Sequence, residues 1–149
     1  MISILIPCYN EEKIISDSIN KIYNFFEDKK YDFEIVVINN ASTDNTLKLL
    51  NEINLNYDIK ILNENRKGKG NAIKFGLLNV KYNKVLILDA DLSTDISELK
   101  DDWLNLDDSL LIGSRFLGDE IDSPKVRKIS GFILNCIIRL FFDIDYRDT

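Results

Sequence analysis

The apolar residues of this chain gather in short runs, which are separated by longer segments of mixed polarity. Four of the runs, at residues 3–7, 33–38, 59–62 and 85–88, consist mainly of isoleucine, leucine and valine. Short aliphatic and β-branched runs between polar breaks are typical of buried strands. A fifth run at residues 110–114 has the same character, so we expect a fifth strand there.

The segments between these runs have the spacing of helices. Ile15, Ile19 and Ile22 recur at intervals of three and four residues, which predicts a helix over residues 12–26. Further helices are expected from the polar turn at residues 39–44 to about residue 52, over residues 71–78 and over residues 97–106. Strand and helix therefore alternate, and this order predicts an α/β fold in which a mostly parallel sheet carries helices on both faces. No linker or repeat interrupts the pattern, so we expect a single domain over residues 1–149.

Polar loops follow the first four predicted strands, at residues 7–12, 39–44, 65–70 and 89–93. The carboxyl ends of parallel strands meet at one edge of a sheet, and open α/β sheets bind their ligands at that edge. We therefore expect the four loops to form a binding site together.

The last of these loops contains two carboxylates one residue apart, Asp89 and Asp91, directly after a strand. Two negative charges held so close favour a cation between them. A hard divalent cation takes oxygen ligands and commonly binds phosphate as well. The motif alone leaves a second interpretation open, in which both carboxylates are solvated at a surface strand end.

The composition of the chain excludes several kinds of catalytic site, metal site and partner. The chain has no histidine, which excludes histidine-based acid and base catalysis and zinc sites with imidazole ligands. Its net charge of −6 argues against a broad nucleic-acid partnership. We expect Cys8 and Cys136 to be reduced and the protein to be cytoplasmic, since no signal peptide is recognisable.

The segment at residues 125–142 differs from the rest of the chain. It has four basic residues and no acidic residue, and its apolar residues follow a helical stripe. Its uninterrupted apolar stretches are shorter than the roughly 20 residues that a membrane-spanning helix needs. We expect a basic amphipathic helix that either packs on the sheet or lies in a membrane interface.

Five motifs, in this order and spacing, resemble the catalytic domain of family 2 glycosyltransferases. They are Ile-Pro-Cys-Tyr-Asn-Glu-Glu at residues 6–12, Val-Ile-Asn-Asn-Ala-Ser-Thr-Asp at 37–44, Asn-Arg-Lys-Gly-Lys-Gly-Asn-Ala at 65–72, Asp-Ala-Asp-Leu-Ser at 89–93 and Gly-Ser-Arg at 113–115. Within that family the chain is most similar to polyprenyl-phosphate sugar transferases such as dolichyl-phosphate mannose and glucose synthases. The resemblance implies a GT-A fold, a nucleotide-diphosphate sugar donor, a divalent cation (Mg or Mn) and inversion at the anomeric carbon.

The resemblance also implies roles for individual residues. The donor nucleotide would be bound by Pro7, Tyr9, Glu11, Asn39, Asn40, Lys69, Gly70, Asp89 and Ala90. Asp89 and Asp91 would hold the metal, and Asp91 would be catalytic. Arg115 would also be catalytic, because it would face the acceptor phosphate.

A phosphate acceptor suits a site without histidine, because it is largely ionised near neutral pH and needs no base to deprotonate it. An arginine such as Arg115 can bind it with two hydrogen bonds. The function expected from the sequence is therefore transfer of a sugar to a polyprenyl phosphate, with peripheral contact at the cytoplasmic membrane face. Two alternatives stay open: transfer to a glycan hydroxyl, or a non-catalytic remnant that binds a nucleotide sugar.

Two departures from the family pattern qualify these expectations. Most relatives have two aspartates and a glycine where this chain has Asn39, Asn40 and Ala41, so the choice between UDP and GDP stays open. The final residues, 147–149, resemble the start of a further motif of the lipid-phosphate subgroup. We therefore expect the chain to be truncated at its C-terminus.

Overall fold

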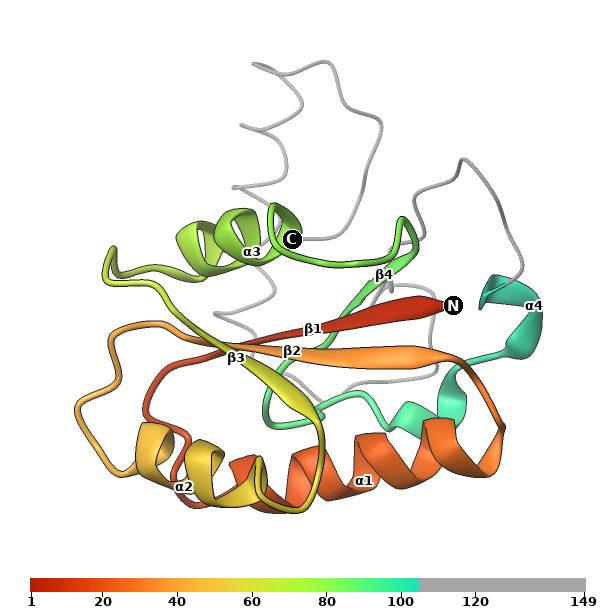
Figure 1. Ribbon diagram of the computed structural model, residues 1–149, viewed down its shortest axis with the longest axis horizontal. Helices are drawn as coiled ribbons and strands as arrows, with labels where there is room; N and C mark the ends of the chain where they lie inside the picture. Colours follow the sequence, from red (N-terminus) through yellow and green to blue (C-terminus); the bar gives the residue numbers. More distant parts are fainter. Residues whose placement is uncertain (105–149) are drawn as a thin grey trace, which may run out of the picture. The chain divides into compact units, whose positions relative to one another are not determined.

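The computed structural model describes residues 1–104, which contain one four-stranded parallel sheet (Figure 1). The strands are β1 (Ile2–Cys8), β2 (Phe33–Asn39), β3 (Ile59–Asn63) and β4 (Val85–Ile87), and their order across the sheet is β3-β2-β1-β4. All three pairings are parallel. The parallel sheet predicted from the apolar runs is therefore confirmed.

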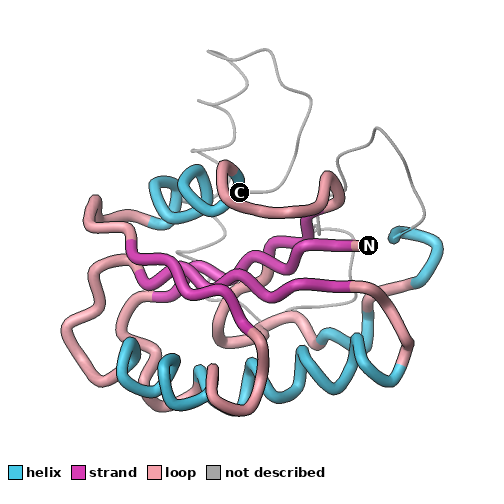
Figure 2. The backbone as a smooth tube through the Cα atoms, in the orientation of Figure 1, coloured by secondary structure: helices cyan, strands magenta, loops and turns pink. Residues whose placement is uncertain are grey.

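Helices cover both faces of this sheet, as the alternation of elements predicts (Figure 2). Helices α1 (Ile15–Asp28) and α2 (Thr46–Ile53) lie on one face, and α3 (Lys69–Leu77) lies on the other. Successive side chains of a strand point to opposite faces, so each buried strand supplies two cores. Ile4 and Ile6 pack with α1, whereas Leu5 packs with α3.

Helix α3 lies close to the sheet because it carries a glycine at the contact. A Cβ atom at Gly76 would lie 2.3 Å from Leu5 Cδ1 and 2.9 Å from Ile38 Cδ1. Both partners are fully buried, so neither has free space to move into. Gly76 therefore sets the distance between α3 and the two central strands.

The strand order places the loops after β1 and β4 next to each other. Strand β1 pairs with β2 on one side and with β4 on the other, and the amide of Leu88 donates to the Leu5 carbonyl at 3.0 Å just beyond β4. In open α/β sheets, the position where the strand order reverses is where ligands bind. The carboxyl ends of β1 and β4 are thus the place to look for a site.

One predicted element is wrong in form. In the described part of the helix expected over residues 97–106, the structure instead has a short 3-10 turn, η1 (Ile96–Glu98), followed by α4 (Asp101–Leu104). Between them Leu99 has an extended backbone, with φ −67° and ψ 112°. The side chain of Asp95 accepts a hydrogen bond from the Ser97 amide at 2.8 Å, which caps this turn locally.

Several predicted features lie outside the described residues: the strand at residues 110–114, Arg115 and the amphipathic helix at residues 125–142. Within residues 1–104, no helix is long and apolar enough to cross a membrane.

Candidate active site

The loop after β1 is held to the loop after β2 by side-chain hydrogen bonds. The Asn10 amide donates to Ser42 Oγ at 3.1 Å, and the Thr43 amide donates to Asn10 Oδ1 at 2.7 Å. Asn10 has φ 58°, a left-handed conformation that asparagine tolerates better than most residues. The Glu11 amide in turn donates to Thr46 Oγ1 at 2.8 Å, at the start of α2. These contacts fix the backbone from which Tyr9 and Glu11 project.

Asp44 stabilises the same junction. Its carboxylate accepts hydrogen bonds from the Thr46 amide at 3.0 Å and from the Glu12 amide at 3.2 Å. Burial alone would raise the pKa of Asp44, but the hydrogen bonds from Thr46 and Glu12 outweigh it and lower the pKa. The ionised Asp44 carboxylate therefore links the loop after β1 to the loop after β2 through these hydrogen bonds.

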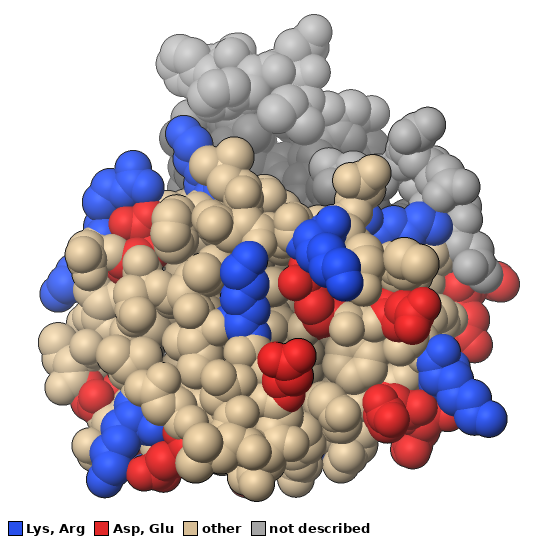
Figure 3. All heavy atoms as spheres, viewed as in Figure 1, with Lys and Arg blue, Asp and Glu red and all other residues tan. Residues whose placement is uncertain are grey.

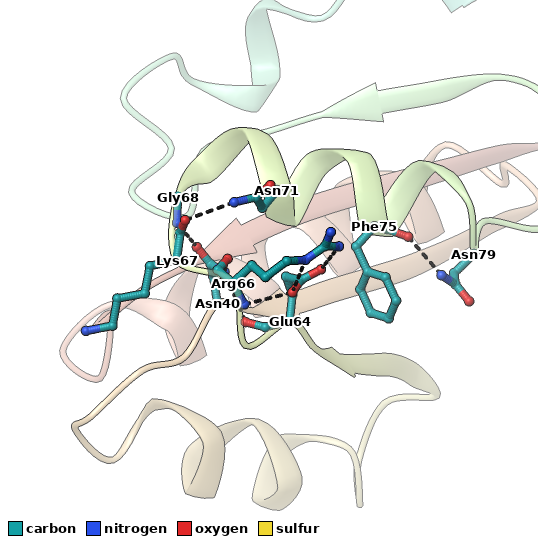
Figure 4. Close-up of polar contacts among 8 residues, drawn as sticks. All are labelled: Asn40, Glu64, Arg66, Lys67, Gly68, Asn71, Phe75 and Asn79. Atoms are coloured by element: carbon teal, nitrogen blue, oxygen red, sulfur yellow. Dashed lines mark hydrogen bonds and ion pairs between the residues drawn. The ribbon is translucent and has the colours of Figure 1, made fainter.

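Asn39 is the last residue of β2, Asn40 follows it, and both are almost completely buried. Asn39 donates from its side chain to Asn63 Oδ1 at 2.9 Å. Asn40 joins the end of β2 to the loop that leads into α3, through hydrogen bonds to the main chain of that loop (Figure 4). The prediction that these residues border the nucleotide base stays a prediction.

An ion pair between the exposed Arg66 and the buried Glu64 lies in the loop that Asn40 holds. The guanidinium of Arg66 contacts the Glu64 carboxylate at 2.7 Å and 3.1 Å, and the Arg66 amide donates to the same carboxylate at 2.8 Å (Figure 4). These hydrogen bonds, together with the charge of Arg66, lower the pKa of Glu64 to about 2. Sequence reasoning missed this pair, because no pattern distinguishes Glu64 from an ordinary surface glutamate.

The Glu64 carboxylate makes the stability of the fold depend on pH. Its pKa is below the ordinary value of 4.5, so it stabilises the folded state above that pH and this contribution is lost as the pH falls towards about 2. We expect Glu64→Gln to lower the urea midpoint at pH 7 and to flatten the decline between these two pH values. Equilibrium urea unfolding of both proteins from pH 7 to pH 2 measures the difference.

The control for this prediction is Glu52→Gln, which removes one partner of an exposed pair with Lys48 at 4.0 Å. Exposed pairs contribute only about 0–1 kcal/mol, so its midpoint at pH 7 should stay near that of the unaltered protein. Equal effects of the two substitutions would contradict a special role for Glu64.

The turn after β4 holds the two aspartates that the sequence singles out. Ala90 is buried between them, and its carbonyl accepts a hydrogen bond from Ser18 Oγ at 2.6 Å. Asp91 Oδ1 accepts from the Ser93 amide at 3.0 Å. Because Ala90 is anchored in the core, Asp89 and Asp91 are presented at the surface on either side of it. Ser18, on α1, therefore anchors this turn, and no sequence pattern pointed to it.

Glu11, across from this turn, lies in the field of the two aspartates. Burial raises the pKa of Glu11, and the negative charges of Asp91, Asp44 and Asp89 raise it further. The loops after β1, β2 and β4 therefore bring carboxylates towards one place, as expected for the carboxyl edge of the sheet.

The donor set at this edge fits a divalent cation that is shared with a ligand. Within residues 1–104, no group of three acidic or cysteine side chains is arranged to hold a metal by itself. Magnesium is usually bound by one or two carboxylates, with substrate phosphates and water completing the shell. Asp89 and Asp91 supply oxygen ligands of that kind, so the residues present fit a metal bound together with a diphosphate.

Basic groups adjoin the acidic ones. Lys69, the first residue of α3, forms an ion pair with Asp89. Lys67 places its ammonium 5.8 Å from the centre of the exposed Tyr9 ring, within the range of a cation–π contact. Near the start of α3, basic and acidic side chains lie next to each other on the face shown in Figure 3. Such a mixed edge can bind a cation and an anionic ligand side by side.

The start of α3 adds main-chain donors to this edge. Gly68, with φ 119°, directly precedes the helix and adopts a conformation that glycine favours. A Cβ at Gly70 would meet no atom within 4 Å, so the first turn of the helix is open. Unpaired amides at a helix start favour anions. The predicted site residues within residues 1–104 lie at the carboxyl edge of the sheet, in the loops that follow it or in the first turn of α3, and Pro7 is the next-to-last residue of β1.

Comparison with known proteins agrees with this geometry. Residues 3–140 match the profile of a family described as glycosyl transferase family 2. A dolichyl-phosphate beta-glucosyltransferase of Trichomonas vaginalis is 32% identical over 99% of this chain, and the match covers 50% of that relative. The chain thus spans about half the length of this relative.

Two solved structures resemble the described fold. A mannosyltransferase from Pyrobaculum calidifontis, in complex with GDP-Man and Mn2+, has a TM-score of 0.53 and 29% identity, over 60% of this chain and 27% of that chain. A fragment of TarS from S. aureus, in complex with UDP, has a TM-score of 0.53 and 26% identity, over 60% of this chain and 27% of that chain. The predicted GT-A type of sheet is confirmed.

Proposed function

Since this chain belongs to glycosyl transferase family 2, we propose that it is a glycosyltransferase that transfers a sugar from a nucleotide-diphosphate donor to a polyprenyl phosphate, with inversion at the anomeric carbon. One observation supports the donor side of this proposal. Lys69 forms an ion pair with Asp89, and Asp91 lies two residues further along the same turn, at the carboxyl edge beside β1. The acceptor is supported by the similarity to a dolichyl-phosphate beta-glucosyltransferase.

On the donor side, Asp89 and Asp91 would hold Mg2+ or Mn2+. When bound, this cation would supply positive charge against the negative charge that builds on the leaving diphosphate. Lys69 adds a second positive charge at the same place, and the open first turn of α3 lets the phosphates approach the main chain. Tyr9 offers an exposed aromatic ring to the nucleotide. The base stays open between UDP and GDP.

On the acceptor side, the nucleophile is a phosphate oxygen. A phosphate monoester is largely ionised near pH 7, so the reaction needs no carboxylate base and no histidine. A planar guanidinium binds a phosphate through two parallel hydrogen bonds. We assign this role to Arg115, which follows the predicted strand at residues 110–114.

Replacing Arg115 tests the acceptor role. Arg115→Ala should raise the KM for the polyprenyl phosphate by about 10-fold or more, because charge-assisted bonds to phosphate contribute roughly 1.5–3 kcal/mol. The donor Kd should change less than threefold. Steady-state kinetics with both substrates varied gives the two numbers, and an equal loss for donor and acceptor would contradict the assignment.

A lipid acceptor places the reaction at a bilayer. The basic segment at residues 125–142 would then bind an anionic membrane surface, to which each lysine or arginine contributes about 1 kcal/mol. We propose peripheral contact at the cytoplasmic membrane face.

The proposed function is tested by following a radiolabelled sugar. The protein is incubated with UDP-glucose or GDP-mannose, Mn2+ and vesicles that contain a polyprenyl phosphate, and the lipid is then extracted. The proposal predicts label in the lipid fraction with one of the two donors. Label in a water-soluble glycan would favour a hydroxyl acceptor, and donor binding without transfer to any acceptor would favour a non-catalytic role.

A further inference from the structure

The side chain of Asn40 uses both of its amide hydrogens inside the protein. Its Nδ2 donates to the carbonyls of Glu64 at 3.0 Å and Arg66 at 2.7 Å, and its Oδ1 accepts from the Gly68 amide at 2.8 Å (Figure 4). The main-chain N–H of Asn40 donates to the Cys8 carbonyl at 2.9 Å. The residue is 4% exposed, so these bonds are sheltered from water.

These contacts fix where α3 begins. Gly68 precedes the helix, and the amides of Asn71 and Ala72 donate to its carbonyl at 3.0 and 3.2 Å. Lys69 is the next residue, and its ammonium reaches Asp89. A shift of the loop at residues 64–68 would therefore move both the first turn of α3 and the cation beside the candidate diphosphate site.

We propose that Asn40 is a positioning residue whose two side-chain N–H donors are both required, and that it holds Gly68 and Lys69 where the donor diphosphate binds. The first half of this proposal concerns the loop alone. The second half rests on the proposed function.

The need for the two hydrogen-bond donors can be tested without changing the size of the side chain. Asn40→Asp keeps the shape of the side chain, but an ionised carboxylate only accepts hydrogen bonds. It would face two main-chain carbonyl oxygens that cannot turn away, so their bonds are lost and the charge is buried beside them.

A matched control lies past the other end of α3. Asn79→Asp makes the same chemical change at a residue whose Nδ2 donates to the Phe75 carbonyl at 2.8 Å, so it too loses a bond to the main chain (Figure 4). Asn79 lies just beyond the last residue of α3, at the opposite end of that helix from Gly68. The two substitutions therefore differ mainly in which end of α3 they affect.

The loop half is tested by amide hydrogen exchange across residues 64–72 of the whole chain. We expect Asn40→Asp to speed exchange at Gly68 and in the first turn of α3 by about 10-fold or more, and Asn79→Asp to leave exchange at these amides within about threefold. Should Asn40→Asp fail to fold, Asn40→Ala removes the same bonds without burying a charge and should speed exchange at the same amides. Unchanged exchange in a folded Asn40 variant would overturn the proposal.

The binding half is tested by titrating the same proteins with UDP and with GDP in the presence of Mn2+. We expect the Kd of the nucleotide that binds to rise about 10-fold in the Asn40 variant and to stay within about threefold for Asn79→Asp. A lower folded fraction with an unchanged Kd would show a merely structural role and overturn this half, as would equal losses in both variants. If the unaltered protein binds neither nucleotide, the proposed function fails, while the exchange experiment still decides the role of Asn40 in the loop.

Discussion

Replacing Asp91 by asparagine should weaken Mn2+-dependent binding of the nucleotide-sugar donor by more than about 100-fold. Loss of a residue that only orients a metal ligand typically costs 10- to 100-fold, and Asp91 is proposed to be a ligand itself. The substitution should leave the turn intact, because an asparagine Oδ1 can still accept the hydrogen bond from the Ser93 amide, 3.0 Å away. Calorimetric titration with UDP-glucose and GDP-mannose, with and without Mn2+, measures the effect.

The control for this experiment lies four residues further along. Asp95 also accepts a hydrogen bond from the amide two residues on, Ser97, at 2.8 Å. Asp95→Asn therefore removes the same charge from the same kind of turn, but at the start of η1. We expect donor affinity within about twofold of the unaltered protein, because substitutions away from a site usually change free energies by less than about 0.5 kcal/mol. Unchanged donor and metal affinity in Asp91→Asn would show that Asp91 does not bind the cation.

Gly76→Ala should lower the free energy of unfolding by about 1–3 kcal/mol, although alanine is the better helix former. The added methyl group would lie 2.3 Å from Leu5 Cδ1 and 2.9 Å from Ile38 Cδ1, and both side chains are fully buried. Either α3 moves away from β1 and β2, or the two core side chains leave their positions. Urea unfolding followed by circular dichroism measures the loss.

Gly70→Ala is the matched substitution in the same helix. A Cβ there meets no atom within 4 Å, so only the gain in helix propensity, up to about 1 kcal/mol, should remain. A stability loss at Gly76 no larger than that at Gly70 would contradict the close approach of α3 to the sheet.

The parallel sheet could be predicted from the chain because its local signals agree. The runs around Ile4 and Ile35 are continuous and aliphatic, which suits strands covered on both faces. The helix expected over residues 97–106 failed for the opposite reason. Ile96 packs in the core and Asp95 caps the start of the 3-10 turn, but the extended backbone of Leu99 ends this turn after three residues and interrupts the helical periodicity.

The candidate site was predicted only in part. Asp89 and Asp91 stand out because two carboxylates directly follow an apolar run. Ser18 and Glu64 have no such sequence pattern. Ser18 meets Ala90 only in the folded chain, and Glu64 differs from a surface glutamate because its side chain is buried beside Arg66. The part played by Asn40 could not be predicted either, because its three loop contacts lie 24 to 28 residues away.

The central claim is that a divalent cation and a nucleotide diphosphate bind together at the carboxyl edge, between the loops after β1 and β4. Paramagnetic broadening by Mn2+ in an amide NMR spectrum locates the cation directly. In the presence of the nucleotide that binds, the signals of Tyr9, Glu11, Lys69 and the turn at residues 89–91 should broaden first. Broadening centred instead on the opposite edge of the sheet, near Tyr31 and residues 81–84, or spread evenly over the chain, would contradict the claim.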